Sequence, residues 1–454
     1  MTPAEFSRAV LRSVRGAVED GELSVTVPAR VVVRPPVRGQ GGGEADFACN
    51  VALQVAKEAG RPPREVAGVL RERLVGVPGI AGVEVAGAGF LNVTLTEAAW
   101  VALVRSVLAE GRGYGHATGS QGQANGQERV VLRAAAGVRA AVTVEVLERI
   151  LPAAGVAVRV AARAVGEAAE DVAVESNGEE IRPRPVSVLP QPGSLPLVGH
   201  AQPGSLPLVG HAQPGPLPLV GHAQPGPLPS AGHAQPGPLP SAGHADPIHP
   251  PHPASPHPTL PHPTLPHPTD PRAHQEWRAL ADRLGPDEVR WALLHPAQTD
   301  AVRLPERPVQ RESNGRFRVQ YAYARTCAMT RNARELGFTA EPAEPAEVGE
   351  AGNMGQAGEP RGERGALRAL YAALAEYPAV VEAAARYRAP DRIARHLEVT
   401  ADAWLRCHDV CPPLPVGEEK PSAVHRARLA LAEAAGTVLA NGLHLLGIST
   451  PERL

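Results

Sequence analysis

Aromatic hydroxyls, an amide and two guanidinium groups lie close together between residues 319 and 333. The side chains concerned are Gln320, Tyr321, Tyr323, Arg325 and Arg331. Small residues alternate with them and no Pro or Gly interrupts the segment, which predicts a helix packed closely on one face. These polar groups need hydrogen-bond partners. Neighbouring helices supply these partners in an interface helix.

A second basic cluster lies further along the chain, in a segment with helical spacing of its apolar residues. Its members are Arg386, Arg388, Arg392 and Arg395. Such a cluster could hold phosphates, and a solvated helix face accounts for it equally well. Cys407, His408 and Cys411 are metal-binding types, but a zinc site needs more ligands at matched spacing. No metal site is therefore expected.

Residues 319–333 resemble the helix with the motif QYAxAR that opens the DALR anticodon-binding domain of arginyl-tRNA synthetases. The end of the chain strengthens this likeness. Residues 427–448 resemble the closing helix of that domain, and residues 451–454 resemble its LGI.APERM end, with a final leucine replacing the usual methionine. Upstream, Asn314 stands where the family has Asn-Pro, and Gly315 replaces the proline.

This likeness covers residues from about 287 to 454. It implies an all-helical bundle that grips the anticodon stem and loop of a tRNA. The bundle residues that we expect to bind tRNA are Gln320, Tyr321, Tyr323, Arg325, Arg331, Arg386, Arg388, Arg392 and Arg395.

The first part of the chain mixes helical and strand patterns, which is typical of an α+β domain with helices over a small sheet. A helix is expected to begin with Thr2 as its cap and Pro3 in its first turn. Further helices are expected over residues 44–57, where an acidic start suits the helix dipole, and from Pro62 onward. The expected strands lie at residues 25–27, 31–33, 83–85 and 90–95.

Two motifs in this part resemble the N-terminal domain of the same synthetase family. Residues 46–52, DFACNVA, are similar to its GDYxxNxA segment, and residues 86–92, AGAGFLN, are similar to its AGPGFIN segment. In the family this domain touches the tRNA elbow. The resemblance therefore implies tRNA-binding roles for Asp46, Phe47, Asn50, Phe90 and Asn92.

The middle of the chain departs from the family. Class I synthetases place a nucleotide-binding sheet here, with an ATP-binding HxGH motif at its first helix and a KMSKS loop later. A strand at 130–132, a helix at 140–154 and a strand at 156–160 predict a single βαβ unit. A two-half nucleotide-binding fold needs far more chain. Residues 134–139, AAAGVR, occupy the HxGH position without a histidine, and no KMSKS-like segment occurs in the sequence.

A proline-rich tract follows. An eleven-residue repeat begins at Gln191, its five copies end at Ala245, and a tract of alternating Pro and His comes next. Prolines at this density prevent helices and central strands, so an extended spacer is expected. A metal-binding tract is the alternative, because imidazoles are good ligands, but nothing in the sequence defines a geometry.

The composition excludes several classes of protein. Among 454 residues, 43% are hydrophobic and only 3% aromatic, so the cores must be built from Ala, Val and Leu. The net charge of −2 gives no overall attraction to nucleic acid, so a tRNA site must come from local clusters, and no DNA partner is expected. Four cysteines make no disulfide framework. No apolar stretch reaches membrane-spanning length, so we expect a cytoplasmic protein without a membrane partner.

We therefore predict a multidomain chain in four parts. These are an α+β N-terminal domain (1–117), an eroded α/β remnant of the catalytic domain (118–185), a disordered Pro/Gly/His-rich linker (186–275) and an all-α DALR-like bundle (276–454).

The predicted function is tRNA binding in translation, with arginine tRNA as the partner and without aminoacylation or any cofactor. One alternative is a divergent arginine–tRNA ligase, which would need ATP and Mg. A third hypothesis is an interaction scaffold that binds a protein partner through the proline-rich tract.

Overall fold

The computed structural model describes residues 1–34, 45–117, 129–132, 137–160, 174–176, 179–181, 271–308, 310–343 and 361–454. All of them belong to one unit of contacting chain, Met1–Pro190 with Leu260–Leu454. The second unit, Gln191–Thr259, lies outside the described residues. The prediction of an extended proline-rich spacer falls there.

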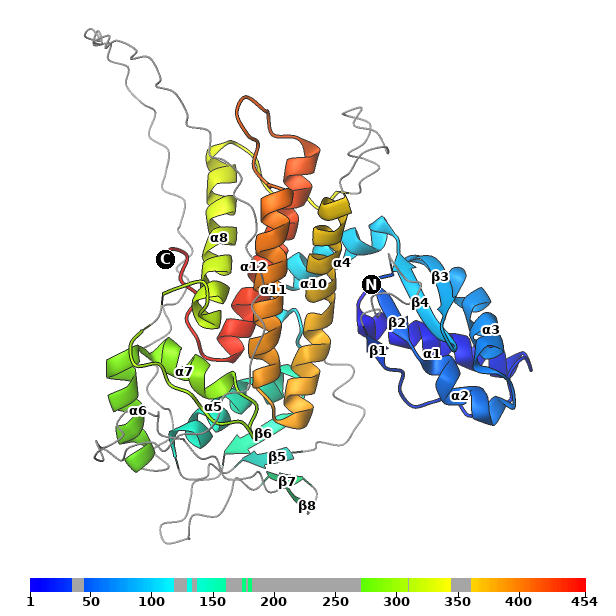
Figure 1. Cartoon of the computed structure of the whole chain (residues 1–454), viewed down its shortest axis with the longest axis horizontal. Helices are drawn as coiled ribbons and strands as arrows, with labels where there is room; N and C mark the ends of the chain where they lie inside the picture. Colours follow the sequence, from blue (N-terminus) through cyan, green and yellow to red (C-terminus); the bar gives the residue numbers. More distant parts are fainter. Residues whose placement is uncertain are drawn as a thin grey trace, which may run out of the picture. The chain divides into compact units, whose positions relative to one another are not determined.

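An antiparallel four-stranded sheet with the order β1-β2-β4-β3 forms the N-terminal part (Figure 1). Its first helix begins as predicted, because the Thr2 side chain accepts a hydrogen bond from the Glu5 N–H and Pro3 lies in the first turn. The elements are α1 (Pro3–Glu19), β1 (Val33–Arg34), β2 (Phe47–Cys49), α2 (Val51–Ala59), α3 (Pro63–Val75), β3 (Ile80–Ala86), β4 (Phe90–Leu95), α4 (Glu97–Glu110) and the 3-10 turn η1 (Gly111–Gly113).

Three of the sequence predictions for this part are wrong in whole or in part. Residues 25–27 form no strand, and of the second predicted strand only Val33 is in β1. The helix predicted over 44–57 begins only at Val51, because Phe47–Cys49 pairs with β4 and β1 instead. The Asp46 carboxylate, expected to start a helix, accepts a hydrogen bond from the Leu95 N–H at 2.7 Å. Sheet pairing therefore overrides the local helical pattern.

The middle contains the predicted βαβ unit. Strands β5 (Arg129–Leu132) and β6 (Ala157–Val160) are parallel and are joined by α5 (Val138–Ala153). Two further strands, β7 (Val174–Ser176) and β8 (Glu179–Ile181), were not predicted. They extend the sheet to the order β6-β5-β7-β8, and both of their pairings are antiparallel.

Helices make up the rest of the described chain, and four long ones lie side by side as a bundle: α8, α10, α11 and α12 (Figure 1). Helix α6 begins within the segment predicted as linker, and α7 begins after Gly285, with no side-chain cap from Asp287. None of the described helices is long and apolar enough to cross a membrane. The bounds are α6 (Pro271–Leu284), α7 (Pro286–Leu294), α8 (Gly315–Glu335), α10 (Arg361–Tyr387), α11 (Asp391–Val410) and α12 (Ala423–Leu445).

Helix α10 runs through Pro378 without a break. Proline has no N–H, so in a continuous helix the carbonyl four residues earlier, that of Leu374, loses its helical partner. The Tyr114 hydroxyl donates a hydrogen bond to this carbonyl at 2.8 Å. A residue at the end of the N-terminal part therefore compensates for the proline in the bundle.

Glycines let α12 approach its neighbours closely. A Cβ at Gly442 would lie 2.5 Å from a methyl group of Leu397 on α11, and one at Gly436 would lie 2.5 Å from the Thr326 hydroxyl on α8. Real Cβ contacts are not this short, so side chains at either position would push the helices apart. Small residues thus set the distance between α12 and the helices that it supports.

Candidate functional site

Helix α8 carries the segment that the sequence singles out, and the side chain of Asn314 caps its start. The Asn314 carbonyl oxygen accepts a hydrogen bond from the Phe317 N–H at 3.1 Å, which satisfies one of the unpaired donors of the first turn. The amide group of Asn314 then reaches across to α7, where it donates to both carboxylate oxygens of Glu288 at 2.9 and 3.1 Å.

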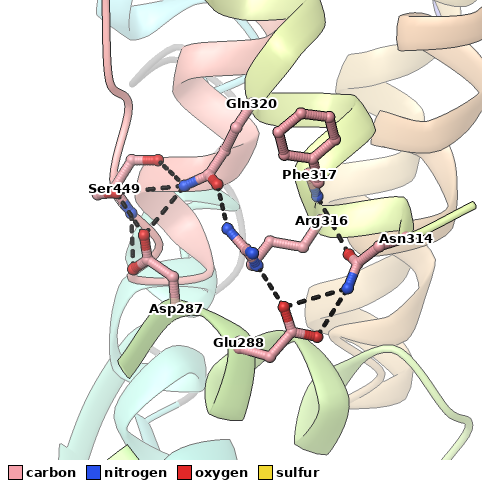
Figure 2. Close-up of polar contacts among 7 residues, drawn as sticks. All are labelled: Asp287, Glu288, Asn314, Arg316, Phe317, Gln320 and Ser449. Carbon is pink, nitrogen blue, oxygen red and sulfur yellow. Dashed lines mark hydrogen bonds and ion pairs between the residues drawn. The ribbon is translucent and has the colours of Figure 1, made fainter. Parts of the chain in front are cut away.

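Figure 2 shows the polar network that this cap begins. Glu288 is buried, with 4% of its surface exposed, and also accepts a hydrogen bond from Arg316 Nε at 2.7 Å. A buried carboxylate is costly unless it is paired and hydrogen-bonded. Arg316 and Asn314 provide these partners, so Glu288 holds the first turn of α8 against α7.

Gln320 lies in the same network and not on the surface. Its side chain is 2% exposed, and its amide group donates to Asp287 Oδ2 and to the Ser449 carbonyl, both at 3.0 Å. Its carbonyl oxygen accepts from Arg316 Nη1. These bonds join α7, α8 and the segment after α12, so this placement gives Gln320 a structural role and no path to an RNA.

Tyr323 faces the same C-terminal segment. Its side chain is half-buried, and its hydroxyl interacts with Thr450 and Cys327. Burial raises the pKa of Tyr323 above its ordinary value. The chain beyond α12 therefore covers the side of α8 that carries Gln320 and Tyr323.

The outward side of α8 carries an aromatic pair. Tyr321 is 36% exposed and stacks on Phe317, one turn earlier, with ring centroids 6.2 Å apart. Phe317 is not among the residues predicted from the sequence, although its spacing of four from Tyr321 is the signal that could have found it. The pair presents a ring surface on which a base could stack.

The helix that carries this aromatic pair is rich in basic side chains. Helix α8 carries five arginines and one acidic residue, Glu335. Arg318 is paired with Asp402 of α11 at 2.7 Å, yet 42% of its side chain is exposed. Arg325 lies near His408, and after burial its charge is the next cause that lowers the pKa of that imidazole. Arg331 is half-buried on the same helix.

The second basic cluster is less concentrated than its sequence suggests. Arg386 pairs with Glu382 at 2.5 Å, and Arg395 approaches Asp391 at 3.5 Å. Arg392 lies over the ring of Tyr387 at 4.7 Å, and the Arg388 guanidinium bonds to the Ala385 carbonyl. Most of these arginines therefore already have local partners at the turn between α10 and α11.

The N-terminal residues predicted to bind tRNA are mostly buried. Asp46, Phe47 and Asn92 are between 4% and 7% exposed, and Phe47 stacks on Phe6 at 5.7 Å. Asn50 is half-buried and accepts a hydrogen bond from Gln54. Only Phe90, at 38%, is exposed among these five residues. A direct contact with RNA is therefore open to Phe90 and partly to Asn50.

The cysteine pair at the end of α11 is buried. Cys407 and Cys411 are both 2% exposed, and their mutual hydrogen bond, followed by burial, raises the pKa of Cys411. Within the described ranges, no group of three or more His, Cys, Asp or Glu side chains is placed to hold a metal.

Comparison with known proteins connects both ends of the chain to one family. Residues 12–95 match the family described as "Arginyl tRNA synthetase N terminal domain", and residues 319–454 match "DALR anticodon binding domain". The "Arginine–tRNA ligase" of Frankia alni is 30% identical, and the alignment covers all of both chains. The chain belongs to the arginyl-tRNA synthetase family. The corresponding ligase of Renibacterium salmoninarum is 29% identical over the same full coverage.

Solved structures of this family share the fold. The arginyl-tRNA synthetase of Thermus thermophilus superposes with a TM-score of 0.54 over all of both chains at 14% identity. The enzyme of Plasmodium falciparum gives the same TM-score at 7% identity and covers 100% of this chain and 99% of its own. The alignment to the Frankia alni ligase spans 575 residues against 454 in this chain, so that relative carries segments with no counterpart here.

The start of α5 falls within residues 134–139, the segment expected at the HxGH position of the family. Arg139 is in its first turn and is 6% exposed. Its guanidinium donates to four backbone carbonyls at 2.8 to 2.9 Å, those of Leu293, Pro296, Ala297 and Asp300. The end of α7 and the segment after it therefore cover this guanidinium and use its donors.

Proposed function

We propose that this member of the arginyl-tRNA synthetase family binds tRNA through the outward side of α8, with a preference for arginine tRNA. The observation that carries the proposal is the partly exposed Phe317–Tyr321 stack on a helix that has four arginines besides Arg316, whose guanidinium bonds to Glu288, and one acidic residue. The whole chain has a net charge of −2, so this local excess of positive charge is what would attract an RNA backbone. The match of residues 319–454 to the anticodon-binding domain supports tRNA binding by the bundle to which α8 belongs.

We further propose that the protein does not aminoacylate tRNA. The sequence has neither an HxGH motif nor a KMSKS-like segment. At the start of α5, the donors of Arg139 already bond to carbonyls, so this guanidinium is not free to stabilise a phosphate. Enzymes usually gain most of their rate enhancement from electrostatic stabilisation of the charge that develops in the transition state. On this proposal no cofactor is needed, and the activity that the chain keeps is RNA recognition.

The second candidate is an arginine–tRNA ligase with a divergent active site. It is favoured by the 30% identity to a ligase over the full length of both chains. This function would require ATP and Mg. The two candidates share tRNA binding and differ in chemistry, so one pair of assays separates them.

Binding of tRNA is tested with purified full-length protein and labelled arginine tRNA, with a tRNA for another amino acid as the comparison. We expect binding at low salt with a preference for arginine tRNA. The logarithm of the binding constant should fall linearly with the logarithm of the salt concentration, because phosphate contacts release counterions. Absence of binding to every tRNA at low salt would refute the first half of the proposal.

Catalysis is tested by ATP–pyrophosphate exchange with arginine and tRNA. We expect no exchange above a blank preparation that has passed through the same purification. Exchange that scales with the amount of protein and survives removal of traces of host synthetase would establish the ligase alternative. The proline-rich tract lies outside the described residues, so its binding to a protein partner stays a prediction.

A further inference from the structure

A hydroxyl, an imidazole and a carboxylate lie next to one another where the loop after α11 enters α12 (Figure 1). The Oγ atom of Ser422 lies 2.8 Å from Nδ1 of His425. The other ring nitrogen of His425, Nε2, lies 3.6 Å from a carboxylate oxygen of Glu419. A hydroxyl, a base and a group that orients the base, in this order, are the parts of an activated nucleophile.

The cap of α12 determines which nitrogen of the imidazole carries the proton. Ser422 is the N-cap residue, and its backbone N–H donates to His425 Nδ1 at 3.1 Å. A ring nitrogen that accepts a hydrogen bond has no proton of its own, so the neutral ring is protonated on Nε2. The lone pair of Nδ1 therefore faces the Ser422 hydroxyl, which is the closer of its two donors and can give up its proton there.

The surroundings keep this imidazole neutral and oriented. The His425 side chain is 12% exposed, and burial lowers its pKa against the opposing charge of Glu419, while Arg428 adds to the decrease. A neutral imidazole is the form that accepts a proton as a general base. The Glu419 carboxylate that faces Nε2 is held in turn by the Val416 N–H at 3.1 Å.

The nucleophile can be reached from solution, because Ser422 is exposed. The next two residues, Ala423 and Val424, begin α12, and within the described part of the chain their N–H groups donate no hydrogen bond. Free N–H groups of a first helical turn favour negative charge. The N–H of the residue after a nucleophilic serine is also a donor that stabilises the developing oxyanion in hydrolases.

Capping of the helix does not by itself require these groups. A capping box ordinarily has Glu or Gln as its third helical residue, and α1 has such a box in Thr2 and Glu5. In α12 the third residue is His425 instead, and the carboxylate of Glu419 lies beside its far nitrogen. The base and the carboxylate are therefore additions to the cap, and both suit proton transfer.

We propose that Ser422 is a nucleophile that accepts an acyl group from small activated esters, with His425 as its general base and Glu419 as the positioning residue. In this step Ser422 Oγ forms a bond to the carbonyl carbon of the donor, and the bond from that carbon to the leaving oxygen breaks. The hydroxyl proton passes to His425 Nδ1 and then to the leaving group. The products are the acyl ester of Ser422 and the free alcohol, so the step needs no further reactant. The proposal is independent of tRNA binding by α8, which contributes none of these residues.

The direct test incubates the full-length protein with p-nitrophenyl acetate at neutral pH and locates the acetyl groups by peptide mass spectrometry. Hydroxylamine removes an acetyl group from a serine ester but not from a lysine amide, which separates Ser422 from the neighbouring Lys420. We expect Ser422 to be acetylated at least about tenfold faster than Ser313, because general base catalysis acts only on Ser422. Ser313 is exposed as well and has no imidazole partner among the described residues.

His425→Gln separates the chemistry from the cap. Glutamine is a regular third residue of a capping box, so this variant should keep the cap and the melting temperature of the wild type. It has no base, and acetylation of Ser422 should fall at least about tenfold. Glu419→Gln changes a side chain that is 61% exposed and should slow the reaction about threefold, because the imidazole is less well oriented. Ser422→Ala should lack the hydroxylamine-sensitive acetyl group.

The outcomes that would overturn the proposal are specific. Acetylation of Ser422 no faster than that of Ser313, or equally fast in His425→Gln, would mean that Ser422 and His425 are only a helix cap. If His425→Gln does not fold, Glu419→Gln provides the measurement, and an unchanged rate in it would count against the site. A protein that is acetylated at Ser422 but binds no tRNA would refute the function proposed above and leave this site standing.

Discussion

The first turns of α5 and α8 both carry an arginine of the kind that binds phosphate, but the two helices differ in what they leave exposed. In α5, Arg139 is 6% exposed and donates to the Leu293 carbonyl near the end of α7 and to three carbonyls of the segment after it. In α8, the Arg316 side chain is 11% exposed and bonds to Glu288, while Phe317 and Tyr321 stack on the outward side. The donors of Arg139 are thus used within the protein, whereas the outward side of α8 keeps an exposed ring.

The two helix starts use their arginine side chains in a similar way. The side-chain donors of Arg139 and Arg316 serve the packing of α7, which contacts α5 and α8. On the function proposed above, the side of α8 rather than its start meets the RNA. The variants below test each half of this contrast.

The largest effect is expected from Arg139→Leu. It removes four hydrogen bonds and leaves buried carbonyls without a donor, at about 1–3 kcal/mol for each group that water cannot reach. We expect a loss of about 4 kcal/mol in the free energy of unfolding, measured by urea denaturation. Arg64→Leu is the matched control, because Arg64 makes one guanidinium–carbonyl bond, to Gly87 at 2.9 Å, on the surface.

An effect of Arg139→Leu no larger than that of Arg64→Leu would show that Arg139 is not structural. In that case the start of α5 would be free for a ligand after all. Nucleotide binding by the wild type that disappears in Arg139→Leu would point the same way and favour the ligase alternative.

The next effect concerns the buried network at the start of α8. Gln320→Ala removes the bonds to Asp287, Ser449 and Arg316 and should cost about 2 kcal/mol of stability. Under conditions where the variant is folded, its tRNA affinity should match that of the wild type. A variant with normal stability and lost tRNA affinity would instead make Gln320 a direct RNA contact.

The sequence predicts some of these features and not others, for physical reasons. The βαβ unit and the start of α1 follow from local periodicity and capping, and the structure confirms them. The strand at Phe47–Cys49 and the continuity of α10 through Pro378 depend on partners far along the chain, Leu91–Val93 and Tyr114. Local patterns carry no information about such partners.

The same limit applies to the site. The sequence predicts a helix over residues 319–333, and α8 includes it. It cannot tell that Gln320 points inward, because Gln320 bonds to Asp287 and Ser449, which are 33 and 129 residues away. Tyr321 and Gln320 are neighbours in sequence, and only the packing of α7 and the C-terminal segment separates their roles.

A smaller effect tests how α8 is seated on α12. In Gly436→Ala the new methyl group would lie 2.5 Å from Thr326 Oγ1 and 3.2 Å from Thr326 Cβ, so we expect a loss of about 1–2 kcal/mol. Gly68→Ala in α3 is the control, since no atom lies within 4 Å of its Cβ position. That change should stabilise the protein by about 0.5–1 kcal/mol through helix propensity. If both variants are stabilised, α12 does not set the position of α8.

The smallest change in stability and the clearest change in function are expected for Tyr321→Ala. Tyr321 is 36% exposed and touches Phe317, so its removal should alter the free energy of unfolding by less than about 0.5 kcal/mol. Stacking on a base is worth about 1–3 kcal/mol, which predicts a tRNA affinity about tenfold weaker in a filter-binding titration.

Tyr321→Phe keeps the ring and should keep the affinity. Tyr387→Ala removes the 57% exposed tyrosine beside Arg392 and should have no effect. If Tyr387→Ala weakens tRNA binding and Tyr321→Ala does not, the RNA lies at the turn between α10 and α11, and the outward side of α8 is only a solvated surface.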